Sequence, residues 1–271
     1  MPATPANTKL LLHLNNNATD SSDSAHSMTV GSGVSYSAAV YKLGTHSALF
    51  DGTSNGFMSA ADSNDWSFGS GDFTVEGWFY HTTLPSSTLQ TYVSQYDQNT
   101  TYPKGWRFYL NHAVTYSLRF QYSTNGTSLA GTLISDTITM AANTWYHMRV
   151  CRVSGNYYFF QDGVAKGSGV FSDTIANPAQ ILVVGASLNA TAKNLSLVGY
   201  ADEVLLVNGT GLSTAGFTPE TAEYTANNSL VNGQGVIVQT DPNKHADGAL
   251  QAQGWTLDGG TSENPASGYA I

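Results

Sequence analysis

Charged side chains and cysteine are both scarce in this sequence. Only 11% of its 271 residues are Asp, Glu, Lys or Arg, whereas an average soluble domain has about 25%. Ser, Thr, Asn and Gly take their place, which is typical of all-β proteins with hydrogen-bonding surfaces. The single cysteine, Cys151, excludes an intrachain disulfide, so the core, a metal ion or assembly must stabilise the fold.

Basic residues are few and scattered. Ten Lys and Arg against nineteen Asp and Glu give a formal charge of -9, and no basic stripe could follow a phosphate backbone. No apolar stretch approaches the roughly 20 residues of a membrane helix. The N-terminal MPATPANTK lacks the basic and apolar segments of a secretory signal. We therefore expect neither nucleic acid nor a membrane as a partner, and we expect synthesis in the cytoplasm.

Helical periodicity is almost absent as well. Short alternating or apolar runs recur instead, such as KLLLHL (9–14), DFTVEGWFY (72–80) and WYHMRVCRV (145–153). Between them, Ser154-Gly155-Asn156 and Asp162-Gly163 have the residues that tight hairpins need. Strands at this spacing, without crossover helices, predict an antiparallel β-sandwich.

The composition changes near residue 217. There the sequence GFTPETAEYTANN resembles the end of a packed unit, and the segment that follows is rich in Gly, Ala, Gln and Asn. We predict an N-terminal arm over 1–8, one domain over 9–224 and a C-terminal extension or docking arm over 225–271. An extension of this length is unusual for a simple connection.

Five segments, in order, carry a family resemblance. They are TKLLLHLNNNATDSSDSAHSMT (8–29), the run from Lys42 to Tyr80, NTWYHMRVCRVSGNYYFFQDGVAKGSG (143–169), GYADEVLLVNGTG (199–211) and GFTPETAEYT (216–225). The series resembles the laminin G-like, concanavalin A-like jelly-roll superfamily, in the form found in structural proteins of tailed phages and environmental viruses. The resemblance implies an all-β, antiparallel two-sheet jelly-roll sandwich with extended terminal arms.

Retaining glucanases share the fold that this resemblance implies. Their strand signature is Glu-x-Asp-x-Glu, because retaining hydrolysis needs two carboxyl groups about 5–5.5 Å apart. Here the matching positions are Asp72, Thr74 and Glu76, so the middle acid is missing. We predict a non-enzyme, with Glu76 on the inner face of a sheet as the partner of a neighbouring Arg, Tyr or His.

The same resemblance raises the question of calcium. Members of the superfamily often carry a structural calcium ion near the sheet rim, and by family position Asp51 and Asp202 would be ligands, with Asp62 or Asp65. Many relatives have Leu-Asp where this chain has Leu14-Asn15, which removes one charged oxygen. The alternative is that Asp51 and Asp202 end strands and accept hydrogen bonds from turn amides.

Glycan binding, the other property that the resemblance implies, requires aromatic rings beside polar loops. One group of aromatic residues lies in the amide-rich stretch TYVSQYDQNTTYPKGW: Tyr92, Tyr96, Tyr102 and Trp106. The alternative for each of these rings is packing in the core or at its rim.

Together these features favour a virion structural protein. Our preferred hypothesis is a phage capsid decoration protein, displayed on the particle surface, whose arms dock on neighbouring capsid or tail proteins by strand addition. Capsid symmetry suggests a homotrimer. The alternative hypothesis is a carbohydrate-binding lectin module, on a tail fibre or exported, that recognises a host glycan.

Overall fold

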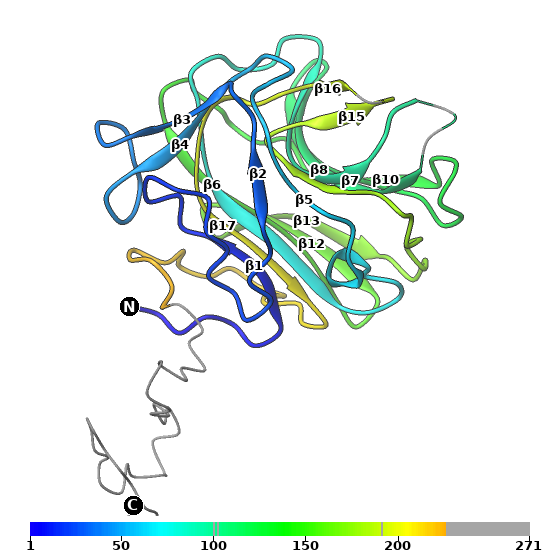
Figure 1. The fold of residues 1–271 in the computed structure, drawn as a ribbon. Helices are drawn as coiled ribbons and strands as arrows, with labels where there is room; N and C mark the ends of the chain where they lie inside the picture. The colour runs from blue at the N-terminus through cyan, green and yellow to red at the C-terminus, as the bar shows by residue number, and fades with distance from the viewer. Residues whose placement is uncertain (100, 102, 191, 226–271) are drawn as a thin grey trace, which may run out of the picture. The chain divides into compact units, whose positions relative to one another are not determined.

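Two antiparallel sheets lie face to face in the computed structural model (Figure 1). The structure describes residues 1–225 except residues 100, 102 and 191, so beyond Thr225 the predicted C-terminal extension lies outside the described residues. The prediction of an all-β two-sheet jelly-roll sandwich is confirmed. Within the described residues, no helix is long and apolar enough to cross a membrane.

The first sheet has eight strands, and its centre is the last strand of the domain. β17 (Val198–Asn208) pairs with β6 on one side, and on the other side with β4 in its first half and β1 in its second half. The remaining strands extend the sheet outward from these pairs. The other strands of this sheet are β1 (Thr8–Leu12), β3 (Val34–Ser37), β4 (Ser47–Asp51), β6 (Phe73–His81), β11 (Trp145–Val153), β12 (Asn156–Gln161) and β13 (Val164–Val170).

The second sheet has seven strands in the order β10-β9-β8-β7-β14-β5-β2. A short hairpin of β15 (Ser187–Asn189) and β16 (Ala192–Asn194) is separate from both sheets, and η1 (Asn64–Trp66) is a single 3-10 turn. The strands of the second sheet are β2 (Met28–Val30), β5 (Met58–Ala60), β7 (Leu89–Tyr96), β8 (Lys104–His112), β9 (Tyr116–Tyr122), β10 (Gly131–Ile134) and β14 (Leu182–Val184).

The two hairpins predicted from turn residues are confirmed. Val153 pairs with Asn156 across Ser154-Gly155, and Gln161 pairs with Val164 across Asp162-Gly163. All four turn residues have φ between 48° and 76°. This left-handed conformation matches the strand twist of two-residue hairpins, and each turn has Gly at its second position, where positive φ carries no steric cost.

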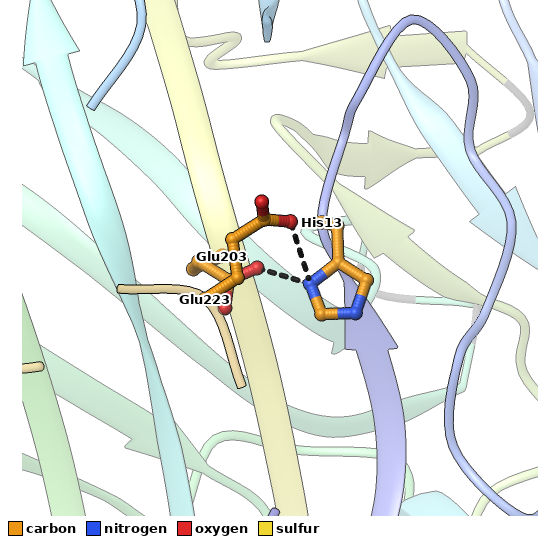
Figure 2. Close-up of side chains that lie close together, drawn as sticks. All are labelled: His13, Glu203 and Glu223. Carbon is orange, nitrogen blue, oxygen red and sulfur yellow. Dashed lines mark hydrogen bonds and ion pairs between the residues drawn. The ribbon is translucent and has the colours of Figure 1, made fainter. Parts of the chain in front are cut away.

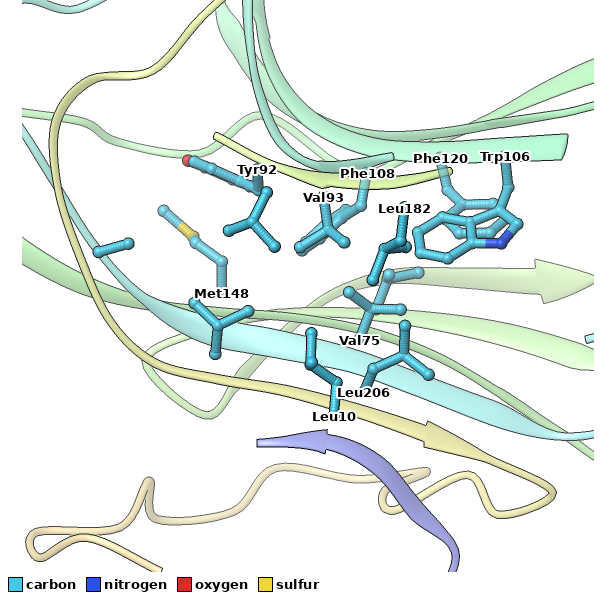
Figure 3. Close-up of a cluster of buried hydrophobic side chains, with 14 of the residues drawn as sticks. Leu10, Val75, Tyr92, Val93, Trp106, Phe108, Phe120, Met148, Leu182 and Leu206 are labelled. Atoms are coloured by element: carbon cyan, nitrogen blue, oxygen red, sulfur yellow. The ribbon is translucent and has the colours of Figure 1, made fainter. Parts of the chain in front are cut away.

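The main core fills the space between the two sheets (Figure 3). Alternate residues of β6, including Phe73, Val75 and Phe79, face inward toward rings of the second sheet. Phe79 stacks on Tyr92 with ring centroids 3.9 Å apart, and Phe73 stacks on Phe120 at 5.1 Å. Aromatic side chains bury large apolar areas, so this layer contributes much of the hydrophobic free energy of folding.

The outer face of the eight-stranded sheet is also partly buried. Residues 209–225, which we call the strap, return across this face after β17. A second small core forms there from Leu11, Leu205, Val207 and Tyr224, with Leu212 packed against it. Leu212 N–H also donates to Thr74 Oγ1 on β6 at 3.0 Å.

This covering corrects the prediction for β6. Glu76, Trp78 and Tyr80 alternate with the core residues and therefore point outward, not to the inner face of the sandwich. The strand is buried along nearly its whole length because the sandwich covers one face and the strap covers part of the other. Alternation alone does not tell which of two covered faces is the core.

The N-terminal segment lies beside the end of the strap. Ala3 forms a parallel bridge with Thr225, and Thr225 N–H donates to the Pro2 carbonyl at 2.9 Å. Residues 1–8, predicted as an arm, therefore belong to the same compact unit as the sandwich. Any docking of this segment on another subunit would first have to break these contacts.

Candidate functional site

The outer face of the eight-stranded sheet brings together Thr74, Glu76 and Asp202 from the sequence analysis. Its three adjacent strands β11, β6 and β17 align their outward residues in cross-strand rows. Four rows follow one another along the strands. They are Cys151–Thr74–Val207, Arg149–Glu76–Leu205, His147–Trp78–Asp202 and Trp145–Tyr80–Tyr200.

In the second row, Glu76 and Arg149 form a buried ion pair. Glu76 is 2% exposed, and its Oε2 accepts a hydrogen bond from Arg149 Nε. Tyr224 Oη donates to Glu76 Oε1 at 3.2 Å, and His147 Nε2 lies 3.4 Å from the same oxygen. The Arg149 guanidinium also lies 3.7 Å from the ring centroid of Phe217 on the strap. The prediction that Glu76 has an Arg, Tyr or His partner is confirmed with all three.

These contacts keep Glu76 ionised. Burial by itself would raise the pKa of this carboxyl, but the positive charge of Arg149 and the contact with His147 outweigh it and lower the pKa to about 2. A carboxylate that is buried, paired and covered by the strap is not presented to a polysaccharide. Asp72 Oδ1 accepts a hydrogen bond from Ser154 N–H at 2.9 Å and so holds the β11–β12 hairpin.

The third row contains a β-bulge that turns two consecutive carboxylates outward. The pairing of β17 with β6 shifts between Asp202 and Leu205, and Glu203 has a φ of 47°. Because Ala201 and Val204 both face the core, Asp202 and Glu203 lie together on the outer face. The bulge is the local reason that this part of the face is acidic.

Asp202 is fully buried beneath the loop before β4. Its Oδ2 accepts hydrogen bonds from Lys42 N–H at 2.8 Å and Leu43 N–H at 3.0 Å, whereas its Oδ1 has no hydrogen-bond partner. Burial raises the pKa of Asp202 to about 7, although these two amides act in the opposite direction. The carboxyl therefore titrates near neutral pH.

The four carboxylates considered for calcium do not converge. Asp51 is exposed at the end of β4, where Oδ1 accepts from Thr53 N–H at 2.9 Å. Its cross-strand partner is Val198, four residues before Asp202, which is about 13 Å along an extended strand. Asp51 and Asp202 thus lie too far apart to share one ion. Asp62 contacts Gln95, and Asp65 accepts from Ser24 and His26 and pairs with Lys9.

A different group of side chains does converge. Among the described residues, His13, Glu203 and Glu223 place their ligand atoms within 4.8 Å of one another (Figure 2). His13 follows β1, Glu203 lies in the bulge, and Glu223 belongs to the strap, so three distant segments meet here. The sequence analysis missed this group because nothing in the spacing of residues 13, 203 and 223 indicates that they meet.

The fourth row is aromatic. Trp145, Tyr80 and Tyr200 lie side by side on adjacent strands, and all three are partly exposed. Ring centroids are 5.3 Å apart for Tyr80 and Trp145, 5.4 Å for Tyr80 and Tyr200, and 6.5 Å for Trp145 and Tyr200. In the neighbouring row, the Lys42 ammonium lies 4.1 Å from the ring centroid of Trp78.

The aromatic group predicted as a glycan platform does not form one. Tyr92 and Trp106 are both 0% exposed and point into the core between the sheets (Figure 3). Trp106 Nε1 donates to the Trp66 carbonyl at 2.9 Å, and the Tyr92 hydroxyl contacts His81 Nε2 at 3.0 Å. Tyr96 is 5% exposed, with the Arg107 guanidinium 5.1 Å from its ring centroid. Tyr102 lies outside the described residues.

This architecture defines a class: a jelly-roll β-sandwich with a partly exposed aromatic row. The chain belongs to the concanavalin A-like lectin/glucanases superfamily, whose Laminin_G_3 family profile matches residues 51–215. The resemblance inferred from the sequence is thereby confirmed. Among curated proteins, no sequence match is found.

Several solved structures share this fold. One is the binding domain of Paraclostridial Mosquitocidal Protein 1, with a TM-score of 0.59 and 14% identity over 76% of this chain. Another is domain 4 of AbnA, a GH43 extracellular arabinanase from Geobacillus stearothermophilus, solved in complex with arabinotriose. It has a TM-score of 0.54 and 18% identity over 76% of this chain. A further structure concerns botulinum neurotoxin type C, a toxin whose cell entry depends on interaction with two ganglioside molecules. It has a TM-score of 0.53 and 12% identity over 76% of this chain.

The matched lengths differ between these relatives. This chain covers 95% of the arabinanase domain. It covers only 50% of the mosquitocidal protein's domain and 49% of the neurotoxin chain. At these identities the likeness shows the fold alone.

Proposed function

We propose that this chain is a non-catalytic carbohydrate-binding module that holds its ligand on the row Trp145–Tyr80–Tyr200. The observation that carries the proposal is the alignment of three partly exposed rings on three adjacent strands. Rings of Trp and Tyr offer rigid apolar faces together with a polar N–H or O–H, the combination that suits the C–H face and the hydroxyls of a sugar.

The angles between the rings indicate the form of the ligand. Tyr80 is tilted by 56° against Trp145 and by 84° against Tyr200. Rings at such angles do not form one plane, so they do not suit the flat surface of a crystalline polysaccharide. They suit a single oligosaccharide whose successive residues turn, with one sugar against each accessible ring.

Two comparisons support the proposal. The arabinanase domain, which this chain matches over nearly the whole of that domain, was solved with a bound trisaccharide. The neurotoxin neighbour acts through gangliosides, whose headgroups are oligosaccharides. A surface depression elsewhere, lined by residues between Ala18 and Val30, has only the ring of His26, and that ring packs on Trp66 with centroids 4.4 Å apart.

The hypothesis of a phage capsid decoration protein has less support. It rests on the sequence features and the resemblance alone, as do the homotrimer and the location on a virion. In the described residues, the N-terminal segment that would dock by strand addition is paired within the chain. Mixing the full chain with particles that lack it, followed by electron microscopy, tests this alternative: ordered density on the shell would favour decoration over glycan recognition.

A glycan array with matched variants tests the proposed function. We expect the full chain to bind a restricted set of oligosaccharides, with arabino-oligosaccharides and ganglioside headgroups among the probes. Trp145→Ala should weaken binding about 10- to 30-fold, since buried aromatic anchors contribute most of the binding energy at such surfaces. Tyr41→Ala is the matched control, because Tyr41 is 44% exposed and lies outside the row.

Two results would contradict the proposal. One is an array without any reproducible binding to oligosaccharides. The other is binding that Trp145→Ala and Tyr200→Ala both leave unchanged, which would place a glycan site elsewhere on the molecule. Circular dichroism of each variant checks that the fold is retained before its affinity is compared.

A further inference from the structure

We propose that His13, Glu203 and Glu223 form a binding site for a divalent transition-metal ion, with Zn²⁺ as the ion that fits best. The three side chains come from β1's end, the bulge of β17 and the strap, and they point toward one another (Figure 2). The proposal does not depend on glycan binding, because the aromatic row lies one row further along the strands.

The distances suit a small ion. Zinc is bound by His nitrogen and carboxylate oxygen at about 2.0–2.2 Å, so two ligand atoms in tetrahedral geometry lie about 3.4 Å apart. His13 Nδ1 is 3.5 Å from Glu223 Oε1, which matches this separation. The hydrogen bond between His13 Nδ1 and Glu203 Oε1 is shorter and would lengthen when an ion replaces its proton.

Each carboxylate is also oriented by a second contact. Asn15 Nδ2 donates to Glu223 Oε1 at 2.6 Å, and Tyr224 N–H donates to Glu203 Oε2 at 2.8 Å. Such contacts around metal ligands reduce the entropy that the ligands lose on binding. His13 and Glu223 keep 17% and 20% of their side-chain surface exposed, so an ion can enter from solvent.

A second observation concerns the charge beside this group. Asp202 precedes Glu203 on the same face, is 0% exposed and has an oxygen without a hydrogen-bond partner. The carboxylates of Glu203 and Glu223 both pair with the imidazole of His13. Two carboxylates, with the Asp202 carboxyl beside them, thus surround one imidazole, and a divalent cation would compensate the negative charge of the two glutamates.

The ligand types favour a transition metal over calcium. Calcium takes six to eight oxygen ligands, whereas this group offers one imidazole nitrogen and two carboxylates. An imidazole with carboxylates suits zinc and its neighbours in the first transition row. With three protein ligands the fourth position would hold water, and the bound ion would fasten the strap to β1 and β17.

Titration calorimetry of the full chain with ZnCl₂ at neutral pH tests the site. We expect one site per chain with micromolar or tighter affinity, and visible absorption bands of tetrahedral Co²⁺ when CoCl₂ replaces zinc. His13→Gln and Glu223→Gln should each weaken binding about 10-fold or more. Zinc should raise the melting temperature of the parent chain, whereas CaCl₂ at the same concentration should not.

Two histidine variants serve as controls. His46→Gln removes a nearby imidazole outside the group, and His245→Gln removes one in the part of the chain that the structure does not describe. Both should bind zinc like the parent chain. If His13→Gln does not fold, Glu223→Gln still tests the metal site, since the Glu223 side chain is 20% exposed. Absence of zinc binding, or binding that neither His13→Gln nor Glu223→Gln weakens, would overturn the proposal.

Discussion

The two ends of the outer sheet face differ sharply, although the same three strands form both. Toward the strap, β6 and β11 contribute Glu76 and Arg149, which are almost fully buried and bonded to each other. Toward the other end, the same strands contribute Tyr80 and Trp145, which remain partly exposed. The strap thus covers the charged end, whereas the aromatic rings at the other end remain partly accessible to solvent.

This difference reverses the usual expectation that charges face water and rings face the core. A buried ion pair contributes little net stability, but each of its members requires the other once both are covered. Partly exposed rings instead retain apolar surface that a ligand can cover. We therefore expect changes at the covered end to affect folding, and changes at the open end to affect binding.

The largest effect should come from breaking the buried pair. Arg149→Met leaves the Glu76 carboxylate covered by the strap without its cation, and should lower the free energy of unfolding by about 3–5 kcal/mol. Urea denaturation at neutral pH measures it. The double variant with Glu76→Gln should recover part of the loss, because it no longer buries an unpaired charge. A loss under about 1 kcal/mol would show that the strap opens easily.

A smaller effect concerns the pH dependence of the covered end. The pKa of Asp202 is raised from 3.8 to about 7 in the folded chain, so the folded state binds the proton more tightly than the unfolded state. Its contribution to stability is therefore present below about pH 4 and is lost as the pH rises to about 7. Asp202→Asn should remove this slope and stabilise the chain at pH 8 by about 2–4 kcal/mol.

The effect of Asp202 is isolated by subtracting the pH profile of stability of the Asp202→Asn variant from that of the parent chain. Glu76 acts in the opposite direction, since its lowered pKa gives stability above about pH 4.5 that is lost as the pH falls toward 2. The contribution of Glu76 is the same in the parent chain and in the Asp202→Asn variant, so it cancels when the two profiles are subtracted. Parallel profiles from pH 4 to pH 8 would mean that Asp202 is better solvated than its burial indicates.

The smallest effect on folding should come from the open end. Trp145→Ala loses the tilted contacts with Tyr80 and Tyr200 and should cost about 1–2 kcal/mol, since each aromatic pair contributes about 0.5–1.5 kcal/mol. The same variant should lose most of its glycan affinity. Thermal denaturation beside a binding titration separates the two readouts, and a loss of stability comparable with that of Arg149→Met would remove the distinction between the two ends.

Strand positions and hairpins could be predicted from the sequence because their causes are local. Alternation in β6 and the left-handed turn residues Ser154 and Asp162 depend on neighbours within a few positions. The superfamily could be predicted as well, because its segments keep their order along the chain.

The candidate sites could not be predicted in the same way. Tyr92 and Trp106 lie in a stretch rich in amides, but strand alternation turns both rings into the core. The sequence predicts Glu76 on the inner face, because nothing local shows that residues 209–225 return over the sheet. His13 meets Glu203 through the pairing of β1 with β17, and it meets Glu223 only through that return, so the group depends on contacts between segments about 200 residues apart in sequence.

The position of β17 also bears on how the chain is made. This strand is the last of the sandwich to be synthesised, yet it lies between β6 and the pair β4 and β1. Until residue 208 has left the ribosome, these earlier strands lack their common neighbour and expose unpaired edges. Contacts of such long sequence separation slow folding and prolong the time in which a nascent chain can aggregate.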